Sequence, residues 1–165
     1  MRITSLNNEF FEKYDLYNID RELLNNEENK HNRPYVIILR LKYKNVRQDF
    51  AIPFRTNIQN TLKSFEYFSL PPRKETKQNH IHGLHFAKMF PIINKYLEKY
   101  NYPDNNHATL TLSVLNKNID KLVSMAQNYI NEFEKGNRVN YCTDIEAIFN
   151  AINKKNDISE TEDSQ

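Results

Sequence analysis

The sequence predicts an α+β fold in a single domain. Two neighbouring segments between residues 35 and 54 carry the apolar runs and the alternation that are typical of β-strands. From residue 109 onward the apolar residues recur instead with the 3.6-residue period of helices. The chain has 165 residues, enough to bury one hydrophobic core, and we find no internal repeat and no linker that would divide it.

The first twenty residues predict a short strand and a helix. Residues 2–6 alternate and fit an edge strand, and Asn7 is placed to cap a helix that carries Phe10, Phe11 and Tyr14. Residues 20–32 are polar and predict a loop, or a short helix followed by a loop.

A β-hairpin follows. Residues 35–43 are continuously apolar at first and then alternate, so this strand should begin in the core and end at an exposed edge. A turn at residues 44–47 leads into a partner strand over residues 48–54. Pro53 has no N–H for a ladder, so we expect the second strand to be interrupted just before Arg55.

The middle of the chain predicts a loop and a third strand. Residues 60–80 contain Pro71, Pro72 and several basic residues, and predict a long basic loop. A third core strand is expected from Gly83 to about residue 93, a helical stretch over 94–100, and a Pro/Asn loop over 101–108.

The last third predicts two helices and a tail. One helix should run from Thr109 and end near Gly136, a plausible C-cap, and a second should begin at Thr143 with Glu146 completing a capping box. The tail over 156–165 has four acidic residues and no basic one, and is expected to be disordered, which leaves 1–155 as the domain.

Composition excludes several function classes. Gly83 and Gly136 are the only glycines, so Gly-rich phosphate loops are absent, and with them dinucleotide folds and P-loop enzymes. The single Cys142 excludes an intramolecular disulfide and a multi-Cys zinc site. We see no signal-peptide pattern and no run of about 18 apolar residues, and therefore expect a soluble cytoplasmic protein without a membrane partner.

Positive charge is concentrated in one part of the chain. Residues 30–88 hold twelve Lys or Arg and three acidic residues, so this segment carries +9 while the remaining 106 residues sum to −7. Aromatic residues are interleaved with these charges, and the combination favours single-stranded nucleic acid, especially RNA. The alternative is a solvated strand face with core aromatics between the charges.

Three groups of residues point to chemistry on phosphate. Arg55, Thr56 and Asn57 follow the expected strand break, where Arg55 could clamp a phosphate and Thr56 could bond a phosphate oxygen or a 2′-OH; the alternative is a solvated turn. Lys88 lies in an otherwise apolar stretch and must either bind an anion or reach solvent along its own stem.

The third group is His80, His82 and His85. On a strand, His80 and His82 share one face while His85 points away. A metal is weakly supported, because no Cys, Asp or Glu lies near in sequence. Acid–base work by one of them is more plausible, and exposed histidines without a role are the alternative.

Carboxylates offer no metal-dependent nuclease site. The basic segment contains Asp49, Glu66 and Glu75, and they form no Asp-x-Asp or Glu-x-x-His pair. A two-metal nuclease needs clustered carboxylates, so a nuclease built from this segment should work without metal or other cofactor.

Read together, three segments resemble the toxins of type III toxin–antitoxin systems. They are Arg33-Pro34-Tyr35 before an apolar strand, residues 50–58 with the element Ile-Pro-x-Arg-Thr/Ser-Asn-Ile, and residues 83–88 before an apolar strand end. The resemblance spans about residues 30–150 and points to the TenpN branch, with ToxN, CptN and AbiQ as relatives.

The resemblance implies a fold and an activity. These toxins have a strongly bent antiparallel β-sheet surrounded by helices, similar to Kid/MazF, and cleave single-stranded RNA without metal to leave a 2′,3′-cyclic phosphate and a 5′-OH. Their antitoxin is a repeat-derived pseudoknot RNA that the toxin cuts from a precursor and that then blocks the active site. Cyclic toxin–RNA hetero-oligomers, cellular or phage mRNA as substrate, and growth arrest in antiviral defence are what the resemblance implies.

The resemblance also implies roles for residues. Arg55 and Thr56 match the Arg and hydroxyl of the motif, and Lys88 matches a Lys of the third-strand motif, so these three are the candidate catalytic residues. We interpret Thr56 as a positioning group and Arg55 and Lys88 as charge stabilisers, with the base unassigned. Two positions depart from the family: Asn60 where a His is expected, and His85 where an acid is expected. Candidate RNA-binding residues are Arg33, Tyr35, Asn57, Lys63, Arg73, Lys74, Lys77, His80, His82 and His85.

Two other functions fit the same sequence. One is a non-catalytic RNA-binding protein, for which the basic segment suffices. The other is a protein adaptor that offers its basic face to an acidic partner. Steep salt dependence of RNA binding separates the adaptor from the RNA functions, and RNA cleavage in EDTA separates the enzyme from the binding protein.

Overall fold

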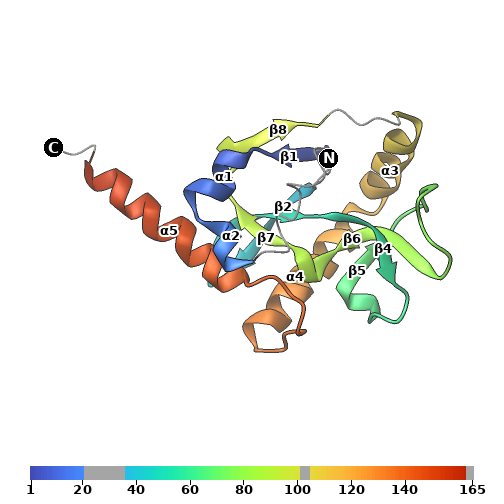
Figure 1. The fold of residues 1–165 in the computed structure, drawn as a ribbon. Coiled ribbons are helices and arrows are strands. Elements are labelled where there is room, and N and C mark those ends of the chain that lie inside the picture. Colours follow the sequence, from blue (N-terminus) through green and yellow to red (C-terminus); the bar gives the residue numbers. More distant parts are fainter. Residues whose placement is uncertain (21–35, 101–104, 163–165) are drawn as a thin grey trace.

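The computed structural model describes residues 1–20, 36–100 and 105–162 (Figure 1). Apart from residue 20, the loop expected over residues 20–32 lies outside the described residues. The candidate RNA-binding residues Arg33 and Tyr35 also lie outside them. Among the helices that are described, none is long and apolar enough to cross a bilayer.

Two three-stranded antiparallel sheets form the centre of the molecule. The first has the order β2-β3-β7 and the second the order β4-β6-β5. Their strands are β2 (Ile37–Tyr43), β3 (Val46–Ile52), β7 (Phe90–Ile92), β4 (Phe54–Gln59), β6 (His80–His85) and β5 (Tyr67–Ser69). The predicted hairpin is confirmed as β2 and β3, joined by Lys44 and Asn45, both with positive φ.

The two sheets are halves of one strongly bent sheet. The chain crosses from the first to the second at Pro53, between β3 and β4, and returns through a 3-10 turn over Phe86–Lys88, between β6 and β7. The backbone N–H of His85 donates to the carbonyl of Pro53 over 3.1 Å, which ties the two crossings together. The predicted bent antiparallel sheet is therefore confirmed.

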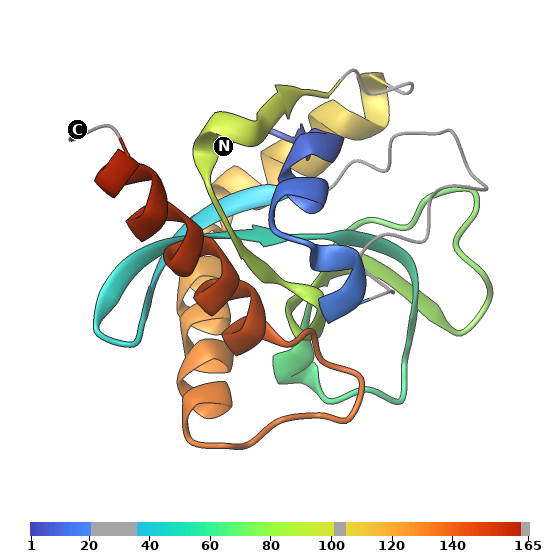
Figure 2. The same cartoon turned by 60° about the vertical axis from the view of Figure 1, so that its left-hand side comes forward.

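Helices cover both faces of the β2-β3-β7 half. Helix α4 (Ile119–Glu134) packs on one face, where apolar residues of β2 and β3 meet Leu122, Ala126 and Ile130. On the other face, α1 (Asn8–Lys13), α2 (Leu16–Ile19) and α5 (Ile145–Glu162) build a second core with β7. Figure 2 shows α5 and α4 on opposite sides of the sheet. Because both faces are covered, the strands are held rigidly at the bend.

The N-terminal expectations are confirmed. Strand β1 (Thr4–Leu6) pairs with β8 (Leu97–Lys99), and the side chain of Asn7 accepts a hydrogen bond from the Phe10 N–H at 3.2 Å. The helical stretch expected over 94–100 is wrong: only a 3-10 turn over Asn94–Tyr96 forms, and the rest is β8, because pairing with β1 outweighs local propensity.

The single helix predicted from Thr109 is two helices. Helix α3 (Asn105–Lys117) ends at Asn118, whose side-chain amide donates to the Val114 carbonyl at 2.8 Å, and α4 begins at the next residue. Amide side chains compete for backbone groups in this way, which the apolar period alone does not reveal. Gly136 has a φ of +89°, as expected for a glycine that ends a helix.

The predicted cap of the last helix is displaced by one residue. Asp144, not Thr143, accepts from the Ala147 N–H at 3.0 Å, while Thr143 is buried and its N–H donates to the Ala87 carbonyl at 2.9 Å. Glu146 does not complete a capping box and instead pairs with Lys44 and Arg138. The α5 backbone stays helical to Glu162, inside the tail that was expected to be disordered.

Two further expectations need correction. The single strand expected over residues 83–93 is divided at the 3-10 turn between β6 and β7, since a chain that follows a bent sheet must leave one ladder before joining the next. The expected loop over 60–80 contains β5, which pairs with β6.

Candidate functional site

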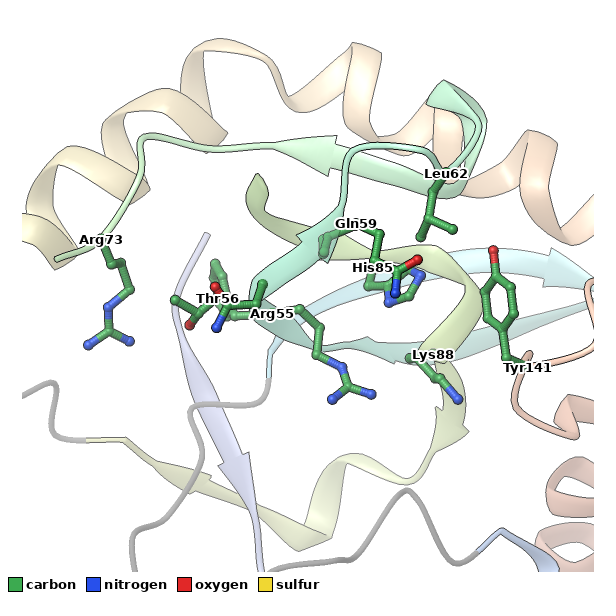
Figure 3. A pocket seen from close by; sticks show the side chains of 11 residues that line it. Arg55, Thr56, Gln59, Leu62, Arg73, His85, Lys88 and Tyr141 are labelled. Atoms are coloured by element: carbon green, nitrogen blue, oxygen red, sulfur yellow. The ribbon is translucent and has the colours of Figure 1, made fainter. Parts of the chain in front are cut away.

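A cavity of about 580 Å³ opens at the bend of the sheet (Figure 3). Strand β4 supplies one wall, the end of β6 and the following 3-10 turn supply another, and the loop between α4 and α5 closes a side. The lining residues are Phe54, Arg55, Thr56, Asn57, Ile58, Gln59, Leu62, Arg73, His85, Lys88 and Tyr141. The cavity thus collects all three candidate catalytic residues.

A β-bulge brings consecutive residues of β4 into the cavity. Arg55 pairs with Gly83 and Ile58 pairs with Ile81, so an advance of three residues along β4 corresponds to an advance of two along β6. A regular strand would point alternate residues away, whereas a bulge turns extra side chains to one side. The interruption expected just before Arg55 is confirmed, because β3 ends at Ile52 and Pro53 separates it from β4. Thr56 and Asn57, however, lie at a bulge inside the new strand β4 and not at a strand end.

Gly83 is required by the close approach of β5. A Cβ at this position would lie 2.3 Å from the backbone oxygen of Phe68, well inside contact distance. Because Gly83 faces Arg55 across the ladder, this packing also fixes the backbone from which Arg55 projects.

Arg73 reaches the cavity from a loop that is tied to β4. The side-chain oxygen of Asn57 accepts from the Lys77 N–H at 2.8 Å, and the Arg73 N–H donates to the Thr76 hydroxyl at 2.9 Å. The Arg73 guanidinium also pairs with Glu75 at 3.4 Å. Lys74 and Lys77, from the same loop, are exposed and do not line the cavity.

His85 lies at the back of the cavity as a neutral imidazole. Its side chain is buried at 7% exposure, and Nε2 has no hydrogen-bond partner among the described residues. Burial, reinforced by the positive charges of Arg55 and Lys88, lowers the pKa of His85 from 6.5 to about 4. At neutral pH this imidazole carries no charge, and its unpartnered nitrogen can accept a proton.

The other two histidines do not line the cavity. The Nδ1 of His82 donates to the Pro71 carbonyl at 2.7 Å, and its ring stacks on Phe54, so it supports the loop that carries Arg73. The Nδ1 of His80 donates to the Gln78 carbonyl at 2.9 Å. As the alternation predicts, His85 points away from the face that holds His82.

Tyr141 is a cavity residue that the sequence did not indicate, as are Gln59 and Leu62. It lies in the loop between α4 and α5, and its hydroxyl donates a short hydrogen bond to the buried carboxylate of Glu66. Burial and the adjacent carboxylate raise the pKa of Tyr141, so the phenol keeps its proton. No periodicity or motif marks a tyrosine in an irregular loop; its place follows only from Thr143 docking this loop on the turn that holds Lys88.

The basic segment over 30–88 does not form one face. Arg55, Arg73 and Lys88 meet at the cavity, but Arg40 and Arg47 line a separate groove between the β2–β3 hairpin and α4. Most of the described aromatics in the segment belong to the core: Tyr43, Phe50, Phe68 and Phe86 are buried. Lys63 is exposed near the cavity, with its ammonium 5.9 Å from the centre of the Phe65 ring.

The cavity has the donors for an anion. In the part of the chain that the structure describes, its lining includes three cationic side chains and no carboxylate. Within residues 1–20, 36–100 and 105–162, no three His, Cys, Asp or Glu side chains gather as a metal site would require.

The comparisons with known proteins place this fold. No protein-family model and no curated protein matches the chain. One similar solved structure comes from a bacterial antiviral system that a processed non-coding RNA regulates. It has 17% identity and a TM-score of 0.67, over 87% of this chain and 92% of its own. Another comes from a bacterial type III toxin–antitoxin system whose toxin is selectively inhibited by a non-coding RNA pseudoknot, with 15% identity and a TM-score of 0.66, over 94% and 97%.

This chain has the fold of the ToxN toxins. The expected resemblance to type III toxins is confirmed at the level of fold, while the TenpN branch stays a prediction. The match extends over nearly the whole length of both neighbours, so the bent sheet and its covering helices are shared together.

Proposed function

We propose that this chain is the endoribonuclease toxin of a type III toxin–antitoxin system. The observation that carries the proposal is the cavity at the bend, where Arg55, Lys88 and Arg73 surround a hydroxyl and a neutral imidazole. Cations without carboxylates suit a polyanionic substrate, and the fold shared with the ToxN toxins supports RNA as that substrate.

The proposed reaction is attack of a ribose 2′-oxygen on the adjacent phosphorus. The 2′-OH gives its proton to a base, the P–O bond to the 5′-oxygen breaks, and the 5′-oxygen takes a proton from water, which leaves a 2′,3′-cyclic phosphate and a 5′-OH. The pentacoordinate phosphate carries more negative charge than the ground state, so Arg55 and Lys88 stabilise the transition state more than the substrate. Thr56, at the bulge between them and Arg73, positions a phosphate oxygen or the 2′-OH.

His85 fills the role of base that the sequence left open. It is the one of the three clustered histidines that lines the cavity, it is neutral, and its Nε2 is unpartnered. Burial is the largest cause of the low pKa of His85, and Arg55 and Lys88 lower it further; when RNA binds, the phosphate charge offsets the part due to these two cations and makes the imidazole a stronger base.

The inhibitor in this proposal is an RNA that fills the same cavity. A pseudoknot antitoxin cut by the toxin itself would leave its own terminal phosphate among Arg55, Lys88 and Arg73. We propose that such toxin–RNA units assemble into cyclic hetero-oligomers and that release of the toxin arrests growth during phage infection.

Purified protein incubated with single-stranded RNA in EDTA tests the proposal. We expect cleavage fragments ending in cyclic phosphate, and no cleavage by Arg55→Ala protein of unchanged circular dichroism. Cleavage that appears only on addition of Mg²⁺ would sink the mechanism. RNA that is bound with steep salt dependence but never cut would favour the non-catalytic RNA-binding protein instead.

A further inference from the structure

We infer that Tyr141 forms a nucleobase subsite, so that its ring stacks on a base next to the phosphate held by Arg55 and Lys88. The inference rests on the proposed function and names the part of the substrate that the cavity reads.

Tyr141 keeps much of its surface open although its hydroxyl is bonded within the protein. The residue is 38% exposed and lines the cavity, and its hydroxyl donates to the carboxylate of Glu66, which is only 2% exposed. Tyrosines at a surface commonly place the hydroxyl in water. Because the hydroxyl of Tyr141 is already bonded to Glu66, a ligand in the cavity is left with the aromatic ring to stack on.

The ring is also held in one orientation. Glu66 uses both carboxylate oxygens, one for Tyr141 and the other for the Lys63 N–H at 3.1 Å, so its task in the fold is to anchor this side chain. The His85 ring lies against the other side, with centroids 6.2 Å apart. A ring fixed before binding loses little entropy when a base stacks on it.

Tyr141 lies at the end of a row of cationic side chains. In Figure 3 the side chains of Arg73, Arg55 and Lys88 follow one another along the cavity, and Tyr141 and Leu62 lie at its far end. Cations along the floor suit successive phosphates, and an aromatic ring with an aliphatic neighbour at the end suits a base. An unstacked base is available only in single strands, loops or bulges, which defines the class of RNA.

Binding of a short single-stranded oligonucleotide with 2′-deoxy sugars tests this subsite without cleavage. Fluorescence anisotropy would compare wild type, Tyr141→Phe and Tyr141→Leu. We expect Tyr141→Phe to bind within a few-fold of wild type and Tyr141→Leu to bind about 5- to 150-fold more weakly, the range for loss of one stacked base. Phe65→Leu is the matched control, because Phe65 is similarly exposed, at 36%, but does not line the cavity.

Abasic nucleotides introduced one position at a time locate the stacked base. At one position the abasic nucleotide should weaken binding to the wild-type protein but cause no further loss of affinity in Tyr141→Leu, as expected for two changes that remove the same contact. Additive losses at every position would overturn the inference, as would equal losses in Tyr141→Phe and Tyr141→Leu, which would assign the effect to the Glu66 bond. A wild-type protein that binds no oligonucleotide would instead overturn the proposed function itself.

Discussion

The buried imidazole of His85 predicts a measurable loss of stability in mild acid. Folding lowers its pKa from 6.5 to about 4, so between these values the unfolded chain binds a proton that the folded chain does not. Stability therefore falls as the pH falls through this window, and is unaffected by His85 above it. The cause is burial first and the charges of Arg55 and Lys88 second.

The size of the effect follows from the two pKa values. Their separation corresponds to about 3 kcal/mol once the pH is below both, and about 2 kcal/mol of this is already lost at pH 5. Urea unfolding at pH 7 and pH 5 should show this loss in the free energy of unfolding of the wild type. The free energy of unfolding of His85→Gln should fall by about 2 kcal/mol less over the same interval.

The comparison between variants isolates His85 from other titrating groups. His82, whose pKa burial also lowers, and the carboxylates are present in both proteins and cancel. His80→Gln removes an imidazole from the same strand outside the cavity, and should follow wild type. If wild type and His85→Gln lose the same stability between pH 7 and pH 5, the description of His85 as a buried neutral base beside two cations is wrong.

Three further predictions concern the cavity and its surroundings. Arg55→Ala should lower the rate of RNA cleavage about 10²-fold or more at unchanged thermal stability, and a single-turnover assay with wild-type rate would refute its role. Gly83→Ala should lower the free energy of unfolding by about 1–3 kcal/mol and remove most of the activity, because the new Cβ meets the Phe68 backbone oxygen. Gly136→Ala is the control: its Cβ would meet no atom within 4 Å among the described residues, but its φ is positive, so it should lose stability and keep activity. Lys77→Ala should leave the cleavage rate unchanged while reducing the salt slope of RNA binding by about one, as measured by titration at several salt concentrations; a lost rate would place Lys77 in the reaction.

The alternation and the turn residues were enough to predict the hairpin and the α+β class, and the resemblance to type III toxins implied the bent sheet, but neither predicted the local breaks. Asn118 divides one predicted helix into two through a side-chain hydrogen bond to the Val114 carbonyl. Asp144 caps the last helix in place of Thr143, because Thr143 is buried in the core. In both cases an interaction between residues outweighed a pattern that describes each residue alone.

The site was predicted in part for a similar reason. The motifs found Arg55, Thr56 and Lys88, which share the cavity, but the bulge that turns Arg55 and Thr56 toward it is a mismatch between two strands and has no local mark in β4. The net charge of residues 30–88 counted the cavity cations together with those of the β2–β3 hairpin, because a sum of charges does not show which face of the fold each side chain occupies. Tyr141 could be found only from the tertiary packing of its loop.

Replacing the ribose at a mapped cleavage site with 2′-deoxyribose tests the central claim most directly. In EDTA, wild-type protein should cut the all-ribose oligonucleotide at that site to leave a cyclic phosphate, identified by mass spectrometry. The singly substituted oligonucleotide should bind as well and remain intact at that bond, because the attacking oxygen is missing. Continued cleavage at the substituted position would contradict attack by the 2′-oxygen and the proposed function of the cavity.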